Sequence, residues 1–320
     1  MFQYVLRRLL LFIPTLIGVS IVIFILVRLV PGDIAEILVF DAGNLPPEEV
    51  QRQIADIRSD LGLDQPVLVQ YSAWMANTLT GNFGYSYWEK RPVREIIADR
   101  FPRSMELALM TIAIAVAWAI PLGVISAVKQ NTWADHLVRV ISISGLSLPL
   151  FLTGILMLYL LIALFSWLPP LEYASFWDDP KTNIEQLIWP AIAQALYISA
   201  PITRLTRSQM LDVIREDYVR TARSKGLNER VVVYRHALRN AMLPVITFIG
   251  WWGGRLLGGI VIMEIIFGIP GMGTSLIDAV NHRDYPTVQA IVFLLAMVFL
   301  TINLAIDLLY AVLDPRIRYS

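Results

Sequence analysis

The sequence predicts an all-α integral membrane protein with six transmembrane helices. Of its 320 residues 56% are hydrophobic and 16% charged, whereas about a quarter of the residues in a soluble domain are charged. The apolar residues gather in six stretches without charges, and about 20 helical residues cross a hydrocarbon layer of about 30 Å. The six uncharged stretches are residues 9–27, 107–128, 140–171, 186–203, 240–254 and 285–306.

The distribution of basic residues predicts that both termini are cytoplasmic. Arg7 and Arg8 precede the first stretch, and the connection between the fourth and fifth stretches holds nine basic residues between 204 and 239. By contrast, Lys181 is the one basic residue in the connection 168–186. Short cytoplasmic loops carry the excess of lysine and arginine, so this pattern sets the orientation.

This orientation divides the chain into three parts. Residues 1–30 form an N-terminal tail and the first transmembrane helix, and residues 31–103 form an extracytoplasmic region. Residues 104–320 form a core of five helices that includes a polar cytoplasmic segment, 212–240.

The extracytoplasmic region is predicted to contain two short helices. Apolar residues at helical spacing indicate one helix that begins near Pro46 and a second that ends before Gly81. These helices form either a structural cap alone or a cap that also docks a substrate-delivering protein.

The cytoplasmic segment 212–240 is predicted to form two short helices separated at Gly226. Such an element presents an apolar knob with a charged rim to the groove of a partner protein. Binding to the membrane surface is the alternative. Acidic residues dilute the basic ones here, and a central glycine gives no advantage to a lipid-binding helix, so protein docking is favoured.

Several classes of function lack the residues that they need. The chain has no cysteine, and its three histidines are far apart, so no metal site is predicted. No catalytic constellation is evident, so the protein is not predicted to be an enzyme. The formal net charge is zero, which gives no indication of a nucleic-acid partner.

Residues 220–226, Arg-Thr-Ala-Arg-Ser-Lys-Gly, resemble the cytoplasmic-loop signature of binding-protein-dependent ABC importer permeases, which is Glu-Ala-Ala, three residues and Gly. Arg220 and Thr221 replace the leading Glu-Ala, as is habitual in the dipeptide/oligopeptide branch. Further blocks resemble that branch in the same order along nearly the whole chain. They are residues 31–33, 61–66, 81–86, 270–273, 283–286 and 314–317.

The resemblance implies a type I ABC importer permease architecture in a bacterial or archaeal cytoplasmic (inner) membrane, as a multi-pass protein. It implies four kinds of partner besides the lipid bilayer: a second homologous permease subunit, two ATPase subunits and an extracytoplasmic substrate-binding protein. A phosphate-binding loop needs lysine after glycine. None of the four lysines follows a glycine, so no cofactor is expected in this chain, and ATP and magnesium belong to the ATPases.

The resemblance also implies which residues couple the permease to the ATPases, by fitting a cleft in an ATPase subunit. These are Asp217, Tyr218, Arg220, Thr221, Ala222, Lys225, Gly226 and Leu227.

The fifth apolar stretch and its continuation contain the predicted translocation-path residues, which are Arg255, Gly254, Gly258 and Glu264. Gly250, Gly254 and Gly258 lie at four-residue intervals and form a glycine stripe on a helix, which lets another backbone approach closely, either within the subunit or from the second permease. A charge in hydrocarbon is costly, so Arg255 should face protein or water. It is expected either to pair with Glu106 as a structural ion pair or to line the passage and hold a substrate carboxylate.

The predicted function is that of the transmembrane permease subunit of an ATP-driven importer for di- or oligopeptides. Glutathione, a nickel chelate or a sugar is the alternative cargo within the same class. A secondary transporter driven by an ion gradient is the competing class, but it would need inverted repeats and ionisable residues at mid-membrane.

Overall fold

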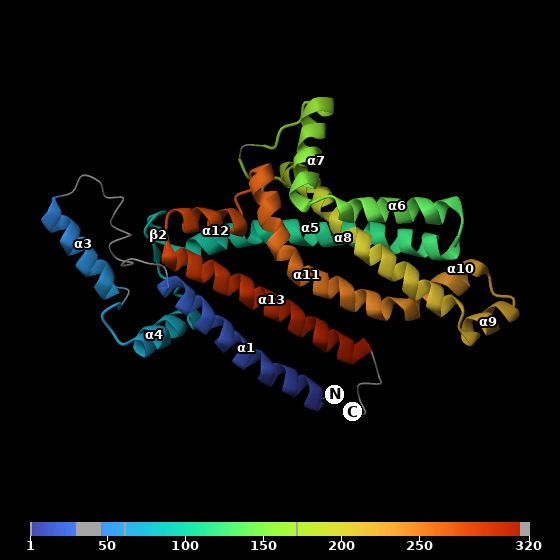
Figure 1. Cartoon of the computed structure of the whole chain (residues 1–320), viewed down its shortest axis with the longest axis horizontal. Coiled ribbons are helices and arrows are strands. Elements are labelled where there is room, and N and C mark those ends of the chain that lie inside the picture. Colours follow the sequence, from blue (N-terminus) through green and yellow to red (C-terminus); the bar gives the residue numbers. More distant parts are fainter. Residues whose placement is uncertain (1, 30–45, 61, 171, 314–320) are drawn as a thin grey trace. The chain divides into compact units, whose positions relative to one another are not determined.

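The computed structural model describes residues 2–29, 46–60, 62–170 and 172–313, and these residues are mostly helical (Figure 1). They fall into two compact units. The first unit comprises Met1–Leu9, Arg103–Pro270 and Thr301–Ser320, and the second comprises Leu10–Pro102 and Gly271–Leu300. The predicted boundaries at residues 30 and 103 follow membrane sides rather than packing, and they stay predictions.

The first unit is a helical bundle that includes, between two long helices, a short polar hook at residues 217–231. Its helices are α5 (Val93–Val128) from Arg103 onward, α6 (Trp133–Ser147), α7 (Leu150–Phe165), α8 (Pro180–Ile214), α9 (Asp217–Ser224), α10 (Glu229–Val231), the π-helix η1 (Val232–Leu238) and α11 (Arg239–Phe267).

Helix α8 is at the centre of this unit and packs against α6, α7 and α11. Its interior positions are occupied by small residues, among them Ala191 and Ala195, which are fully buried. The helix therefore faces protein on most of its circumference, and it tolerates polar residues such as the buried Gln194.

Glycines set how closely the neighbouring helices approach α8. A Cβ at Gly123 of α5 would lie 2.6 Å from Cβ of Thr206, and a Cβ at Gly259 of α11 would lie 2.7 Å from Nε2 of Gln194. At Gly123 a Cβ would also lie 2.9 Å from the backbone oxygen of Thr203, so a larger side chain there requires a shift of α5 or α8. At Gly259 the nearest atoms are the ends of the Gln194 and Leu150 side chains, so this glycine makes room for those two side chains.

Gly250, the first glycine of the predicted stripe, also packs within the subunit. A Cβ there would lie 2.4 Å from Cγ1 of Ile306 on α13 (Tyr285–Leu313). At this position the stripe serves close packing inside the chain.

A buried carboxylate joins α5, α6 and α8 at one end of the bundle. Asp135 of α6 is fully buried and accepts two hydrogen bonds from Arg207 of α8, at 2.8 and 2.9 Å. It also accepts one from the Ser126 hydroxyl at 2.5 Å and one from the Asn131 backbone N–H at 3.0 Å. These donors balance the cost of burying the charge.

The second unit contains the two helices expected outside the core. They are α3 (Pro47–Asp60) and α4 (Val67–Leu79), and α4 ends before Gly81 as predicted. The remaining elements are α1 (Phe2–Arg28) from Leu10 onward, the antiparallel strands β1 (Tyr85–Ser86) and β2 (Arg91–Pro92), α12 (Met272–Asn281), and the part of α13 before Thr301.

Two contacts organise this unit. Asp284 precedes α13 and accepts hydrogen bonds from the hydroxyls of Ser86 and Thr287, at 2.5 and 2.6 Å, which ties the β1–β2 hairpin to the start of the helix. Burial raises the pKa of the Asp284 carboxyl. A cluster of aromatic rings links α1, α4 and α13 through Phe24, Trp74 and neighbouring rings.

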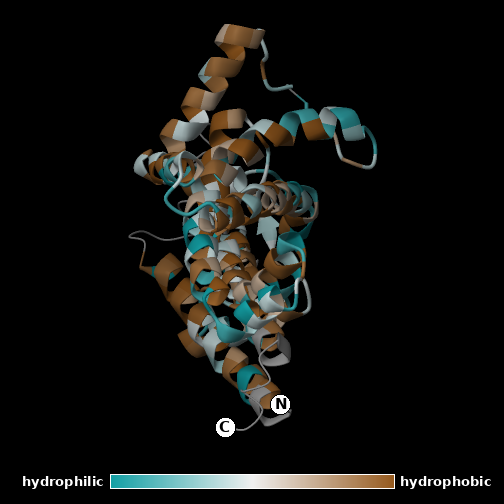
Figure 2. Ribbon diagram, turned by 90° about the vertical axis from the view of Figure 1, so that its right-hand side faces the viewer, coloured by the Kyte–Doolittle hydropathy of each residue, from teal (hydrophilic) through white to brown (hydrophobic). Residues whose placement is uncertain are grey.

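Three of the described helices are long and apolar enough to cross a membrane: Val5–Arg28, Val93–Val128 and Tyr285–Leu309. Two bent pairs raise the number to five if each pair is one span, namely α6 with α7 and the stretch Glu229–Leu256 with Gly258–Phe267. Figure 2 shows hydrophobic residues, in brown, along many of the helical turns. The remaining predicted stretch, the fourth (186–203), lies in α8, whose position between other helices explains its lower apolar content.

We expect Asp135→Asn to destabilise the purified protein strongly, by about 3 kcal/mol, because it leaves Arg207 without its buried counter-charge. Thermal unfolding followed by size-exclusion chromatography measures the loss. Arg139→Gln is the matched control in the same cluster, since Arg139 is 3.6 Å from Asp135 and its side chain is 41% exposed. Equal melting temperatures for the two variants would contradict a structural role for the buried pair.

Candidate functional site

The predicted docking residues lie on a short two-sided helix and the turn after it. In α9, Val219 and Ala222 are buried against Val232, whereas Tyr218 and Arg220 are exposed. Ala222 therefore holds the helix in place. The other predicted residues are all exposed: Asp217, Thr221, Lys225, Gly226 and Leu227.

Gly226 makes the turn between α9 and α10. Its φ is +75°, a left-handed conformation that glycine adopts without strain. Arg223 and Glu229 close the turn with two hydrogen bonds, at 2.7 and 3.2 Å. The expected pair of short helices around a glycine is confirmed, and an ion pair fixes the angle of the turn.

The hook formed by residues 217–231 is fastened to α11. The Asn240 amide in the first turn of α11 donates a 2.7 Å hydrogen bond to the Tyr218 hydroxyl. Between them lies the π-helix η1, and π-helices are often found at functional sites. Movement of α9 can therefore be transmitted to α11 through a hydrogen bond as well as through the backbone.

One face of α11 is exposed along its length, although the helix lies within a bundle. Trp251 and Arg255 are exposed four residues apart, on one face of α11 before its bend between Leu256 and Gly258. Gly258 and Ile265 are exposed seven residues apart, on one face after the bend. Nothing in the described structure lies within 4 Å of a Cβ at Gly258. This face is apolar except for one charge.

The Arg255 guanidinium lies over indole rings. Its Cζ is 5.0 Å from the ring centre of Trp251 and 5.9 Å from that of Trp252, which are cation–π distances. Among the described residues Arg255 makes no ion pair, and its guanidinium hydrogens are free to bind an anion. The spacing of four residues between Trp251 and Arg255 is the signal for this contact in the sequence, because residues four apart lie on one face of a helix.

Arg255 was expected either to form an ion pair with Glu106 or to line the passage. The first expectation is wrong, because the described residues show no ion pair between Arg255 and Glu106. Glu106 accepts hydrogen bonds from the Tyr173 hydroxyl at 2.6 Å and from the Asn183 amide at 2.9 Å, which occupies its carboxylate elsewhere. Burial, together with the bond to Glu106, raises the pKa of the Tyr173 phenol, so that this proton stays on Tyr173.

The other two predicted path residues lie away from the exposed face. Gly254 is buried. Glu264 is fully buried and accepts a hydrogen bond from the Ser104 hydroxyl of α5. The structure thus brings Arg255 and Gly258 together on an exposed face and places Gly254 and Glu264 inside the subunit.

The buried Asp135–Arg207 pair went unnoticed in the sequence. Arg207 contributes to the basic count that sets the orientation, and nothing in its spacing from Asp135 distinguishes it from the exposed basic residues around it.

The amino-acid sequence of this chain matches two families of membrane transport proteins. Residues 119–319 match the family described as binding-protein-dependent transport system inner membrane component. Residues 1–108 match the corresponding N-terminal family of membrane components.

Relatives match over the full length of both chains. The glutathione transport system permease protein GsiC of Salmonella typhimurium (strain LT2) is 41% identical over 320 residues, and that of Escherichia coli (strain K12) is 40% identical. A solved structure, a crystal structure of an amino acid ABC transporter with histidines, is 15% identical with a TM-score of 0.48. The matched region covers 69% of this chain and 93% of the chain in the solved structure.

Proposed function

This chain belongs to the family of inner-membrane components of binding-protein-dependent transport systems and is a permease subunit of an ABC importer, and we propose that its cargo is a di- or oligopeptide of the glutathione type. The observation that supports this choice of cargo is the sequence identity of 40–41% with glutathione permeases over all 320 residues. Glutathione is itself a short peptide with free carboxylates, so it lies within the predicted substrate class.

The exposed face of α11 supports a place for that cargo. Arg255 offers an unpaired guanidinium beside two indole rings, and Gly258 leaves open space next to it. A guanidinium binds carboxylates by paired hydrogen bonds, and a charge on a lipid-facing surface would be costly. In the proposal this face lines the translocation path, opposite a second homologous permease subunit.

The hook at residues 217–231 is the proposed docking site for the ATPases. It offers exposed Tyr218 and Leu227 as apolar contacts within a charged rim, and its turn is braced by Arg223 and Glu229. In the proposal, two ATPase subunits bind ATP and magnesium and hydrolyse the ATP, and an extracytoplasmic binding protein delivers the cargo.

The proposed topology has six spans with both termini in the cytoplasm. Five come from the three single helices and the two bent pairs, and α8 is the sixth. Its polar residues are consistent with a span because α6, α7 and α11 surround it.

Introduced cysteines test this topology, since the natural chain has none. We expect a membrane-impermeant maleimide to label Ser224→Cys only in inside-out vesicles and Asp178→Cys only in right-side-out vesicles or whole cells. Both positions are exposed in the structure. Labelling of both positions from the same side would refute the arrangement.

We expect Gly226→Pro to abolish association with the ATPases while membrane insertion stays normal, because proline cannot adopt a φ of +75°. Co-purification of the ATPases with the permease measures the effect. Gly81→Pro is the matched control, since Gly81 has a φ of +81° in the second unit. If Gly226→Pro retained the ATPases as well as Gly81→Pro does, the docking site would lie elsewhere.

We expect Arg255→Met to lower uptake of labelled glutathione by about tenfold or more, the value of one charge-assisted hydrogen bond to a carboxylate. Initial uptake rates at equal amounts of assembled transporter measure this. Arg94→Met removes another exposed arginine as a control. Unchanged uptake with normal assembly would remove Arg255 from the transport path.

A further inference from the structure

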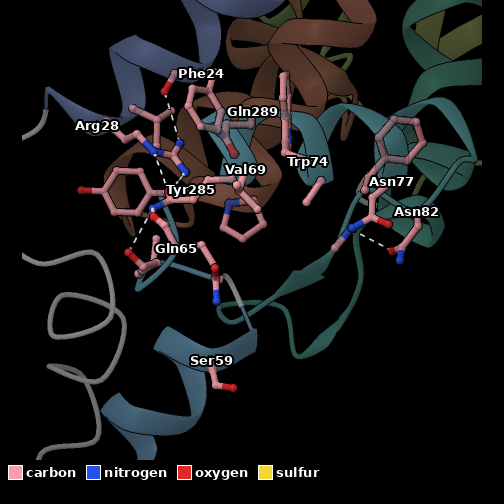
Figure 3. Close-up of a pocket in the computed structure, with 18 residues that line it drawn as sticks. Phe24, Arg28, Ser59, Gln65, Val69, Trp74, Asn77, Asn82, Tyr285 and Gln289 are labelled. Carbon is pink, nitrogen blue, oxygen red and sulfur yellow. Dashed lines mark hydrogen bonds between the residues drawn. The ribbon is translucent and has the colours of Figure 1, made fainter. Parts of the chain in front are cut away.

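The second unit contains a pocket of about 300 Å³ that none of the proposed transport steps uses (Figure 3). It is enclosed by the last turn of α1, by α4, by the segment 82–84, and by the first turn of α13. The loop after α3 contributes Gly62, Leu63 and Gln65 to its wall.

Arg28 is the one charged side chain among the residues that line this pocket. Its guanidinium lies 3.5 Å from the ring centre of Phe24 and donates to Oε1 of Gln70, at 3.1 Å from Nε and 2.5 Å from Nη2. The amide of Gln70 is itself fixed by hydrogen bonds to the carbonyl oxygens of Leu63 and Gln65. Within the described residues Arg28 has no carboxylate partner, so neutral groups hold a full positive charge in place.

Two further polar groups of this pocket have no partner in the described part of the chain. They are the hydroxyl of Tyr285 and the amide nitrogen of Gln289, and these residues are only 7% and 9% exposed. Buried donors are nearly always hydrogen-bonded in folded proteins. Unpaired donors beside an uncompensated cation indicate that the pocket takes a ligand with acceptor oxygens and negative charge.

The position of the pocket indicates where such a ligand comes from. Arg28 ends the candidate span Val5–Arg28, and Tyr285 begins the candidate span Tyr285–Leu309. Arginine and tyrosine at the ends of spans lie at the level of lipid headgroups. On the side of α1 that carries Arg28, Ile17, Ile21 and Ile25 are exposed, an apolar strip suited to acyl chains.

We propose that this pocket binds the phosphate of an anionic phospholipid headgroup. Arg28 neutralises the phosphate, and Gln289 and Tyr285 donate hydrogen bonds to its oxygens. The rings of Phe24 and Trp74 cover the glycerol end, and the acyl chains follow the exposed strip of α1.

Native mass spectrometry of the assembled transporter tests this proposal. The complex is released from nanodiscs that contain equal amounts of phosphatidylglycerol and phosphatidylcholine. We expect bound phosphatidylglycerol on the natural protein, about tenfold less on Arg28→Gln, and an intermediate amount on Arg28→Lys, which keeps the charge but not the fork of donors.

Arg7→Gln is the matched control, because Arg7 is an exposed arginine at the opposite end of the same helix. Gln289→Leu gives a second, independent variant, which keeps Arg28 and should lower retention severalfold. Equal retention of phosphatidylglycerol by Arg28→Gln and Arg7→Gln, with both complexes assembled, would overturn the proposal.

Two further arms separate the possible sources of the phosphate. Excess inorganic phosphate should leave phosphatidylglycerol bound, because the free ion lacks the apolar part that the α1 strip covers. Displacement of the lipid by inorganic phosphate would assign the pocket to a soluble anion instead. Retention of phosphatidylcholine as strong as that of phosphatidylglycerol would refute the preference for an anionic lipid.

Discussion

The close approach of α8 to its neighbours is the constraint on which the first unit depends. Gly123 allows α5 to cross α8 close to its backbone, and Gly259 of α11 makes room for the Gln194 side chain of α8. At one end of the bundle, the buried Asp135 holds Arg207 of α8 and Ser126 of α5. The exposed face of α11 and the hook lie outside these contacts and are open to other molecules.

Helix α11 has a buried side and an exposed side with different surroundings. Its buried side carries Gly254, and Glu264 with its hydrogen bond from Ser104. Its exposed side carries Arg255 among indole rings. A charge that would be expensive in lipid is well placed beside a water-filled path or a second subunit, and in the proposed transporter both lie on that side.

Much of this could be predicted from the sequence, because long apolar runs and glycine turns act locally. The helices on either side of Gly226, and α3 and α4 in the second unit, follow from hydrophobic spacing. The partner of Arg255 could not be predicted in this way. Depth in the membrane suggested Glu106, but its actual partners, Tyr173 and Asn183, approach from other parts of the chain. The glycine stripe is a second example, because its members look alike in the sequence but differ in the structure. Gly250 packs against Ile306, whereas Gly258 faces open space.

The π-helix between the hook and α11 has a consequence for how the chain tolerates changes in length. A π-turn holds one residue more than an α-turn, so losing a single residue within Val232–Leu238 can convert the segment to ordinary helix with α11 still in register. The same deletion inside α8 would rotate every later side chain by about 100° and bring Gln194 and its neighbours out of alignment with Gly259. We therefore expect natural variation in length to collect in η1 and to be absent from α8.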